Sequence, residues 1–344
     1  MKTGNRHEAT GNSKQARVLG FALSVMLFAL SSSAQAQPQQ QAKVTKIGEL
    51  IFRGADRPGL GFGRQVFRDK LRELGFIEGK NVIYETRFAE SKLDRYPALA
   101  DELVRLKVDV LVASSTPEAL AFRNATKTIP VVFSIATDPV AEGLVDSLAR
   151  PGGNVTGVTA IAPLLAGKRL ELLKETIPKL SRVAVLQNQQ DPGSAQPWKE
   201  SLVAARELGL QLHTMEVGSA EKFEAAFKEA RKAHSNALTV IAGSIATSNT
   251  KLVAELAAKY RLPAVYDRAE FVIAGGLMSY GPDRVELYKR AAVFVDKILK
   301  GTKPADIPVE QPKKFELVIN LKAAKQIGLI IPPNVLARAD KVIK

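Results

Sequence analysis

Cysteine is absent from this chain of 344 residues, and histidine is scarce, with His7, His213 and His234 as its three occurrences. Without cysteine there is no disulfide, no thiolate nucleophile, no cysteine-bound zinc and no iron–sulfur cluster. The histidines are far apart in the sequence, so neither a histidine metal site nor a Ser–His–Asp triad is expected. We therefore expect no metal, no cofactor and no catalytic residues.

Long apolar runs are also lacking. The uncharged run from Val18 to Leu30 is too short to cross a hydrocarbon core of roughly 30 Å. It follows four basic residues and precedes Ala34-Gln35-Ala36, an order that predicts a secretory signal peptide at residues 1–36. No cysteine follows for lipid attachment, and the glutamine-rich residues 37–42 are expected to be a flexible tether. These features predict a periplasmic protein.

The net charge of +14 comes from 49 Lys and Arg against 35 Asp and Glu. The predicted signal peptide contributes four basic residues and one acidic residue to it. Elsewhere basic and acidic residues are interleaved, as in Phe67 to Glu73, and do not form one basic stripe. A DNA-binding helix-turn-helix would be expected at the N-terminus, where the signal segment lies. We therefore expect no nucleic-acid partner.

Strand-like and helix-like segments alternate along the remaining chain. Apolar runs at 46–52, 81–88, 108–113 and 129–135 are typical of strands, and the spacing of leucines at 67–75 and 94–107 is typical of amphipathic helices. This alternation predicts βαβ units and parallel sheets. The chain is also longer than a single hydrophobic core usually supports, so two domains are expected.

The sequence repeats itself once, at an offset of about 135 residues, which predicts two copies of one flavodoxin-like, or Rossmann-like, lobe. Five landmarks match: Lys46–Leu50 with Arg182–Leu186, Leu74-Gly75 with Leu208-Gly209, Asp109–Ala113 with Ala237–Ile241, Ile129–Val132 with Leu262–Val265, and Gly143–Val145 with Gly276–Met278.

A turn-rich stretch, Arg150–Asn154, joins the two copies. After the second copy, a helix is expected at 283–300, then a strand at 315–319 and a helix at 320–326, so that the chain crosses between lobes more than once. The expected division is residues 43–155 plus about 278–312 for the first lobe, and 156–277 plus about 313–344 for the second, joined by a multi-segment hinge.

Four motifs resemble those of ABC transporter substrate-binding proteins, in the group whose named members bind tryptophan and other aromatic amino acids. The motifs are Thr137–Ala141, Arg150–Gly157, Gly275–Gly281 and Lys314–Leu321. The resemblance covers nearly all of the chain after the signal segment. It implies a type I periplasmic-binding fold, with two parallel-sheet lobes, a three-segment hinge and a ligand trapped in the cleft. Where relatives often have Asn-Pro, this chain has Asn188-Gln189. This difference leaves the identity of the ligand undecided.

Ligands of open parallel sheets bind beyond the carboxyl ends of the strands, so two facing lobes predict a cleft lined from both sides. The candidate ligand-binding residues share this position at strand ends: Phe52, Arg53, Phe88, Ser114, Ser115, Thr116, Thr137, Asp138, Asn188, Ser244, Tyr266, Asp267 and Tyr280.

Two groups of these residues are candidates to bind the charged parts of a ligand. Ser114, Ser115 and Thr116 precede a helix and could hold a carboxylate, although Thr116 could also serve as an ordinary N-cap. Asp138 and Asp267 could each accept a ligand ammonium group. The alternative for both is a capping or turn role.

The aromatic candidates Phe52, Phe88, Tyr266 and Tyr280 could pack on an apolar part of the ligand, or belong to the core. Arg53 could pair with a ligand carboxylate or be a solvated loop charge. We expect the solute-binding component of an ABC importer, which traps an amino acid or related carboxylate by hinge closure.

The expected partners are the small-molecule ligand and an inner-membrane ABC permease, with the protein acting as a monomer. The alternatives are a ligand-sensing receptor subunit and a flavodoxin-like enzyme. A dinucleotide-binding enzyme is disfavoured because Gly59, Gly61 and Gly63 have the wrong interval and Arg64 occupies the third glycine position.

Overall fold

The computed structural model describes residues 44–54, 61–160, 162–241 and 243–344. The predicted signal peptide at 1–36 and tether at 37–42 lie outside these ranges. Among the residues described, none of the helices combines the length and apolar character needed to cross a membrane.

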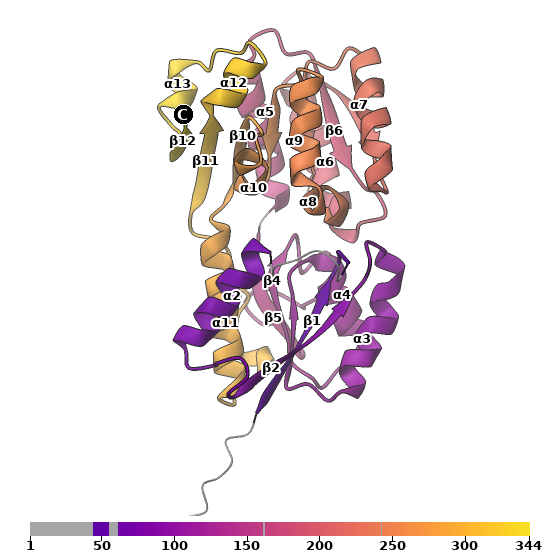
Figure 1. The fold of residues 1–344 in the computed structure, drawn as a ribbon, viewed down its shortest axis with the longest axis vertical. Coiled ribbons are helices and arrows are strands. Elements are labelled where there is room, and N and C mark those ends of the chain that lie inside the picture. The colour runs from indigo at the N-terminus through magenta and orange to yellow at the C-terminus, as the bar shows by residue number, and fades with distance from the viewer. Residues whose placement is uncertain (1–43, 55–60, 161, 242) are drawn as a thin grey trace, which may run out of the picture. The chain divides into compact units, whose positions relative to one another are not determined.

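The first sheet contains five parallel strands in the order β2-β1-β3-β4-β5 (Figure 1). This is the 2-1-3-4-5 order of flavodoxin-like folds. The strands are β1 Thr45–Ile51, β2 Val82–Phe88, β3 Val110–Ala113, β4 Val131–Ala136 and β5 Val155–Thr159, and the helices are α2 Phe62–Glu73, η1 Leu93–Arg95, α3 Tyr96–Arg105 and α4 Thr116–Ala125.

The second sheet has the order β12-β11-β10-β9-β8-β6-β7. Its strands are β6 Arg182–Gln187, β7 Gln211–Glu216, β8 Ala237–Val240, β9 Ala264–Tyr266, β10 Met278–Pro282, β11 Phe315–Asn320 and β12 Lys341–Ile343. Five of these strands, in the order β7-β6-β8-β9-β10, repeat the 2-1-3-4-5 order. This confirms the predicted pair of flavodoxin-like lobes. Strand β11 extends this sheet antiparallel to β10.

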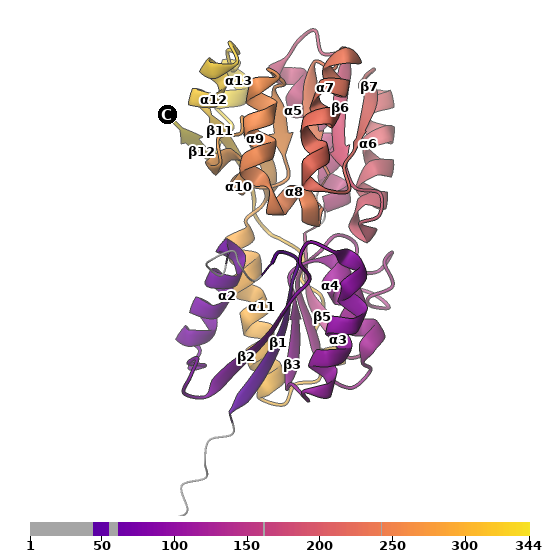
Figure 2. The ribbon, with the colours of Figure 1, turned by 45° about the vertical axis from the view of Figure 1, so that its right-hand side comes forward.

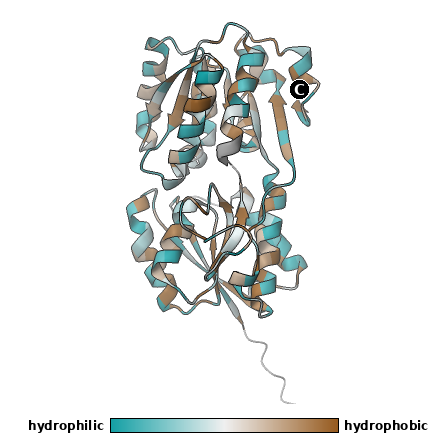
Figure 3. Ribbon diagram, turned by 180° about the vertical axis from the view of Figure 1, so that it is seen from behind, coloured by the Kyte–Doolittle hydropathy of each residue, from teal (hydrophilic) through white to brown (hydrophobic). Residues whose placement is uncertain are grey.

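Helices cover both faces of the second sheet (Figure 2). They are α5 Ala162–Thr176, η2 Pro192–Ser194, α6 Ala195–Glu207, η3 Ala220–Lys222, α7 Phe223–Lys232, α8 Ser244–Ser248, α9 Thr250–Lys259, α10 Ala269–Ile273, α12 Leu321–Gln326 and α13 Pro333–Leu336. All residues of the central strands β3 and β8 are buried, as expected for strands covered on both faces. Figure 3 shows the helices banded in hydrophilic and hydrophobic colours, which fits one buried and one solvated side.

Helix α11, Arg284–Leu299, follows β10 of the second lobe in sequence but packs against α2 and β4 of the first lobe (Figure 1). The chain then passes through η4, Pro304–Asp306, and returns to β11. On the way, residues 307–310 run beside β5. The hydroxyl of Thr156 donates to the Ile307 carbonyl at 2.7 Å, and the Thr159 amide donates to the Glu310 carbonyl at 2.9 Å. Two of the chain crossings between lobes are therefore hydrogen-bonded to one another.

The observed lobe boundaries differ from the expected ones at two strands. Residues 156–159 were assigned to the second lobe, but they belong to β5, which pairs with β4 in the first sheet. Residues 278–282 were assigned to the first lobe, but they form β10, which pairs with β9 and β11 in the second sheet. Strands β5 and β10 are each the fifth strand of their own copy. Each therefore pairs within its own sheet before the chain crosses to the other lobe.

Gly157 in β5 makes an unusually close backbone contact with β4. A Cβ at this position would lie 2.0 Å from the carbonyl oxygen of Phe133. We predict that Gly157→Ala destabilises the protein by about 2–3 kcal/mol, because β5 must move away from β4. Urea unfolding monitored by circular dichroism measures this change.

Gly153 provides the matched control, because a Cβ there has no atom within 4 Å. Gly153→Ala should change the free energy of unfolding by less than about 0.5 kcal/mol. Equal effects of the two substitutions would contradict the close-contact explanation.

Candidate functional site

A cavity of about 440 Å³ is lined by both lobes where the carboxyl ends of their strands face each other. The first lobe contributes the ends of β1, β3 and β4 and the start of α2, and the second contributes the segments after β6, β8 and β9. Helix α11 adds Arg284 and Tyr288. This volume lies within the roughly 300–1,000 Å³ typical of small-molecule sites.

The structure separates the predicted site residues into two groups. Seven line the cavity: Phe52, Arg53, Ser114, Ser115, Thr116, Thr137 and Ser244. Six do not: Phe88, Asp138, Asn188, Tyr266, Asp267 and Tyr280. The first group consists mainly of small hydroxyl residues, which can provide hydrogen bonds without filling the space.

Three polar candidates serve local structure. The Asp138 carboxylate accepts the Ala141 amide at 3.1 Å, which is the turn role considered as its alternative. The side-chain oxygen of Asn188 accepts the Gln190 amide at 3.0 Å. Thr116 lines the cavity but is not the N-cap of α4, because the helix begins at Thr116 itself and Ser115 holds the cap position. The Thr116 hydroxyl accepts the Thr137 amide at 3.1 Å and so joins two strand-end segments.

The aromatic candidates outside the cavity lie in or beside the cores. Tyr266 is fully buried and stacks on Phe271 with ring centroids 4.6 Å apart. Tyr280 lies next to Phe315 at a centroid distance of 6.4 Å. Phe88 ends the edge strand β2. Tyr266 is therefore a core residue, which was the alternative to ligand binding.

The carboxylate of Asp267 pairs with the guanidinium group of the neighbouring cavity residue Arg268. Arg268 thus occupies the position expected for a ligand cation. Both Nε and Nη2 of Arg268 donate to the same Asp267 oxygen, at 2.8 and 2.6 Å. Burial alone would raise the pKa of Asp267, but Arg268, Arg169 and Arg284 outweigh burial and hold that pKa below its ordinary value. Three cations thus surround one carboxylate, and two of them line the cavity.

Asp191 faces the cavity from the second lobe, and the sequence pattern did not single it out. It lies just beyond β6 and is 4% exposed. Its carboxylate accepts the Gly193 amide at 3.2 Å and both the amide and hydroxyl of Ser244, at 3.0 and 3.2 Å. Burial nevertheless raises the pKa of Asp191. The Ser244 contacts come from the start of α8, 53 residues away in the sequence, so no local motif reveals them.

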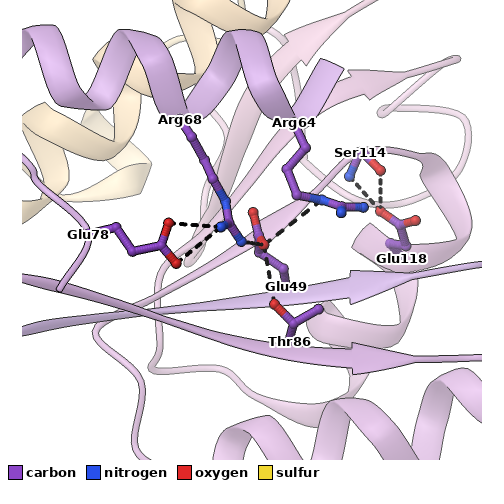
Figure 4. A network of polar contacts seen from close by, with 7 residues as sticks. All are labelled: Glu49, Arg64, Arg68, Glu78, Thr86, Ser114 and Glu118. Carbon is purple, nitrogen blue, oxygen red and sulfur yellow. Dashed lines mark hydrogen bonds and ion pairs between the residues drawn. The ribbon is translucent and has the colours of Figure 1, made fainter. Parts of the chain in front are cut away.

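Glu118 contributes a second buried carboxylate to the cavity, from the first turn of α4. One of its oxygens accepts the amide and hydroxyl of Ser114, at 2.5 and 2.8 Å (Figure 4). The other accepts the Tyr96 hydroxyl at 3.4 Å. Burial raises the pKa of Glu118, and the Ser114 hydrogen bonds oppose that shift. Glu118 therefore holds the loop after β3 in place.

Two arginines of α2 approach Glu49, a β1 residue that lines the cavity and is 3% exposed. Arg68 donates to Glu49 at 2.7 Å, whereas the Nε of Arg64 lies 3.9 Å from the same oxygen (Figure 4). Burial lowers the pKa of Arg64, and Glu49 and Glu118 only partly offset this. Arg64 lines the cavity, so it presents a positive charge there.

The described residues contain no group of three or more His, Asp or Glu side chains arranged to hold a metal ion. The cavity instead combines arginines with buried carboxylates and hydroxyls. Such a set can bind a small molecule that carries charges of both signs.

Two doubly wound lobes that enclose one cavity define the class of type I periplasmic-binding proteins. The sequence model of the family described as ABC transporter substrate binding protein matches residues 53–343, and the chain belongs to this family. It is therefore a substrate-binding component of an ABC transporter, and members of this family bind small molecules.

Relatives and solved structures agree with this assignment. The chain is 27% identical over 274 residues to a tyrosine-binding protein of Clostridioides difficile, which covers 80% of this chain and 79% of that protein. A conserved domain protein from Vibrio cholerae is similar with 30% identity and a TM-score of 0.81, over 87% of this chain and all of that one. A Streptococcus pneumoniae ABC domain in complex with L-Trp has 29% identity and a TM-score of 0.79, over 87% and 99%.

Glu142, which follows β4, gives the protein a pH-dependent stability. Burial raises its pKa to about 7, the nearby Asp138 and Asp191 charges add to this, and a hydrogen bond from Thr116 opposes it. An acid with a raised pKa binds its proton more tightly in the folded state. The contribution of Glu142 to the free energy of unfolding therefore falls as pH rises from about 4.5 to about 7.

We predict that Glu142→Gln removes this component, so that the variant gains on the order of 2 kcal/mol over the native protein between pH 4.5 and pH 7. Urea unfolding across that range measures the difference. Glu207→Gln, at an exposed position of α6, should leave the pH profile unchanged. Parallel profiles of native protein and Glu142→Gln would show that Glu142 does not titrate in this way.

Proposed function

We propose that this chain captures an aromatic α-amino acid in the cavity and delivers it to an inner-membrane ABC permease. The observation that carries the proposal is the pairing, in one cavity, of a poorly compensated cation, Arg64, with a buried carboxylate, Asp191. Buried charges are costly unless paired. An amino-acid zwitterion supplies the carboxylate for one and the ammonium group for the other.

The apolar part of the cavity supports an aromatic side chain. Phe52, Phe62, Phe67 and Tyr288 all line it, and Phe62 is 50% exposed at the start of α2. Stacking of aromatic rings contributes about 0.5–1.5 kcal/mol beyond the burial of area. The tyrosine-binding and L-Trp-bound relatives support the same ligand class.

The remaining parts of the proposal concern location and assembly. Residues 1–36 would direct export to the periplasm, consistent with the extracytoplasmic role of substrate-binding proteins in importers. In this proposal the protein acts as a monomer. We propose binding and release of the ligand without chemical change.

We predict that L-tyrosine or L-tryptophan binds to the protein and that loss of either ligand charge weakens binding by about 10- to 150-fold, the equivalent of one charge-assisted hydrogen bond. Calorimetric titration should compare L-tyrosine with L-tyrosinamide, which lacks the carboxylate, and with 3-(4-hydroxyphenyl)propionate, which lacks the ammonium group. The proposed ligand class would be overturned if the protein binds none of L-tyrosine, L-tryptophan and L-phenylalanine.

Asp191→Asn should weaken L-tyrosine binding by the same factor and leave 3-(4-hydroxyphenyl)propionate unaffected, because only the zwitterion has an ammonium group to lose. Asp138→Asn is the matched control, since Asp138 lies outside the cavity and asparagine can keep its turn. If Asp138→Asn weakens L-tyrosine binding and Asp191→Asn does not, the ammonium site is assigned to the wrong residue.

A further inference from the structure

Helix α2 carries two arginines one turn apart, and both reach toward the same buried carboxylate. Arg64 and Arg68 occupy positions i and i+4, so they lie on one face of the helix. The Glu49 side chain below them is 4% exposed. One carboxylate therefore faces two guanidinium groups, and the second charge needs another partner.

Arg68 makes the closer contact and is held there from three sides. It donates to Glu49 at 2.7 Å and to the two Glu78 oxygens at 3.3 and 3.2 Å (Figure 4). Its guanidinium also lies 3.6 Å from the ring centroid of Tyr84, in a cation–π contact. These contacts come from β1, β2 and the loop before β2, which hold Arg68 over Glu49.

Arg64 is the arginine left with a weak partner. Among the described residues, its ion pair is the 3.9 Å contact with Glu49, whose carboxylate is also approached by the Thr86 hydroxyl at 3.5 Å. Burial lowers the pKa of Arg64, which is the effect expected of a cation that lacks full compensation. Arg64 lines the cavity, whereas Arg68 does not.

We propose that Arg68 is a positioning residue for ligand selectivity: it occupies Glu49 and thereby keeps Arg64 available for the ligand carboxylate. This inference rests on the proposed function. Without Arg68, Glu49 can form a close ion pair with Arg64 and compete with the ligand for it. Selectivity for a carboxylate-bearing ligand then depends on a residue that does not touch the ligand.

The test measures the ratio of affinities for L-tyrosine and L-tyrosinamide by calorimetric titration, at a pH below the pKa of the amide's amine. Arg68→Gln should reduce this ratio by about tenfold, because only L-tyrosine needs the free charge of Arg64. Removing the competitor as well, in Glu49→Gln/Arg68→Gln, should restore the ratio. Arg68→Lys should retain most of it.

Arg72→Gln is the matched control, since Arg72 lies one turn further along α2 and pairs at the surface with Asp69. A general loss of fold would lower both affinities and leave the ratio unchanged. An unchanged ratio in an Arg68→Gln variant that still binds L-tyrosinamide with the native affinity, or a reduced ratio that the double variant does not restore, would overturn the positioning role alone. Failure of the native protein to bind either compound would overturn the proposed function and this inference with it.

Discussion

The packing of α11 against α2 is the contact on which the arrangement of the cavity depends. The two helices meet so closely at Gly63 that a Cβ there would lie 2.0 Å from the Tyr288 ring. This contact places Arg64 at the mouth of the first lobe, and it brings Arg284 and Tyr288 to the same cavity from a segment beyond the second lobe. A change in the seating of α11 would therefore alter the charge, the aromatic wall and the lobe connection together.

Charge balance in the cavity follows from how each ion is partnered. Asp267 is surrounded by arginines, whereas Asp191 is held by amides and a hydroxyl and forms no ion pair among the described residues. Amide donors orient a carboxylate without neutralising it. In the proposed function, Arg64 and Asp191 therefore supply one site of each sign for a zwitterion.

Much of the fold could be predicted because it depends on local patterns. The alternation of strands and helices and the internal repeat both reflect burial, which is written in the order of apolar residues. The cavity hydroxyls at Ser114, Thr116 and Ser244 were also predictable, since they follow strands at the carboxyl edge of each sheet. The lobe boundaries were less so, because β5 and β10 differ from crossing segments only in the strands that they pair with.

The charged residues of the site were harder to predict because their roles depend on partners distant in the sequence. Asp191 is held by Ser244, and Arg64 is left with a long contact because Arg68 takes the closer one with Glu49. Conversely, Asp138 and Asp267 looked suitable by position, but the Ala141 amide and Arg268 occupy them. A strand-end position identifies a residue that can reach the cleft. It does not identify which charges remain unpaired there.

The route of α11 also affects how the first lobe can be completed as the chain emerges. One face of its sheet is covered by residues such as Phe294 and Val295, which belong to the same buried cluster as Ile47 and Val132. These residues follow the whole second copy in sequence, so a nascent first lobe must leave part of that apolar face uncovered until nearly the entire chain is available. Neither lobe is a continuous segment, and no single cut of the chain can release one intact. The two lobes can therefore complete their sheets and their covering helices only once almost the whole chain is present.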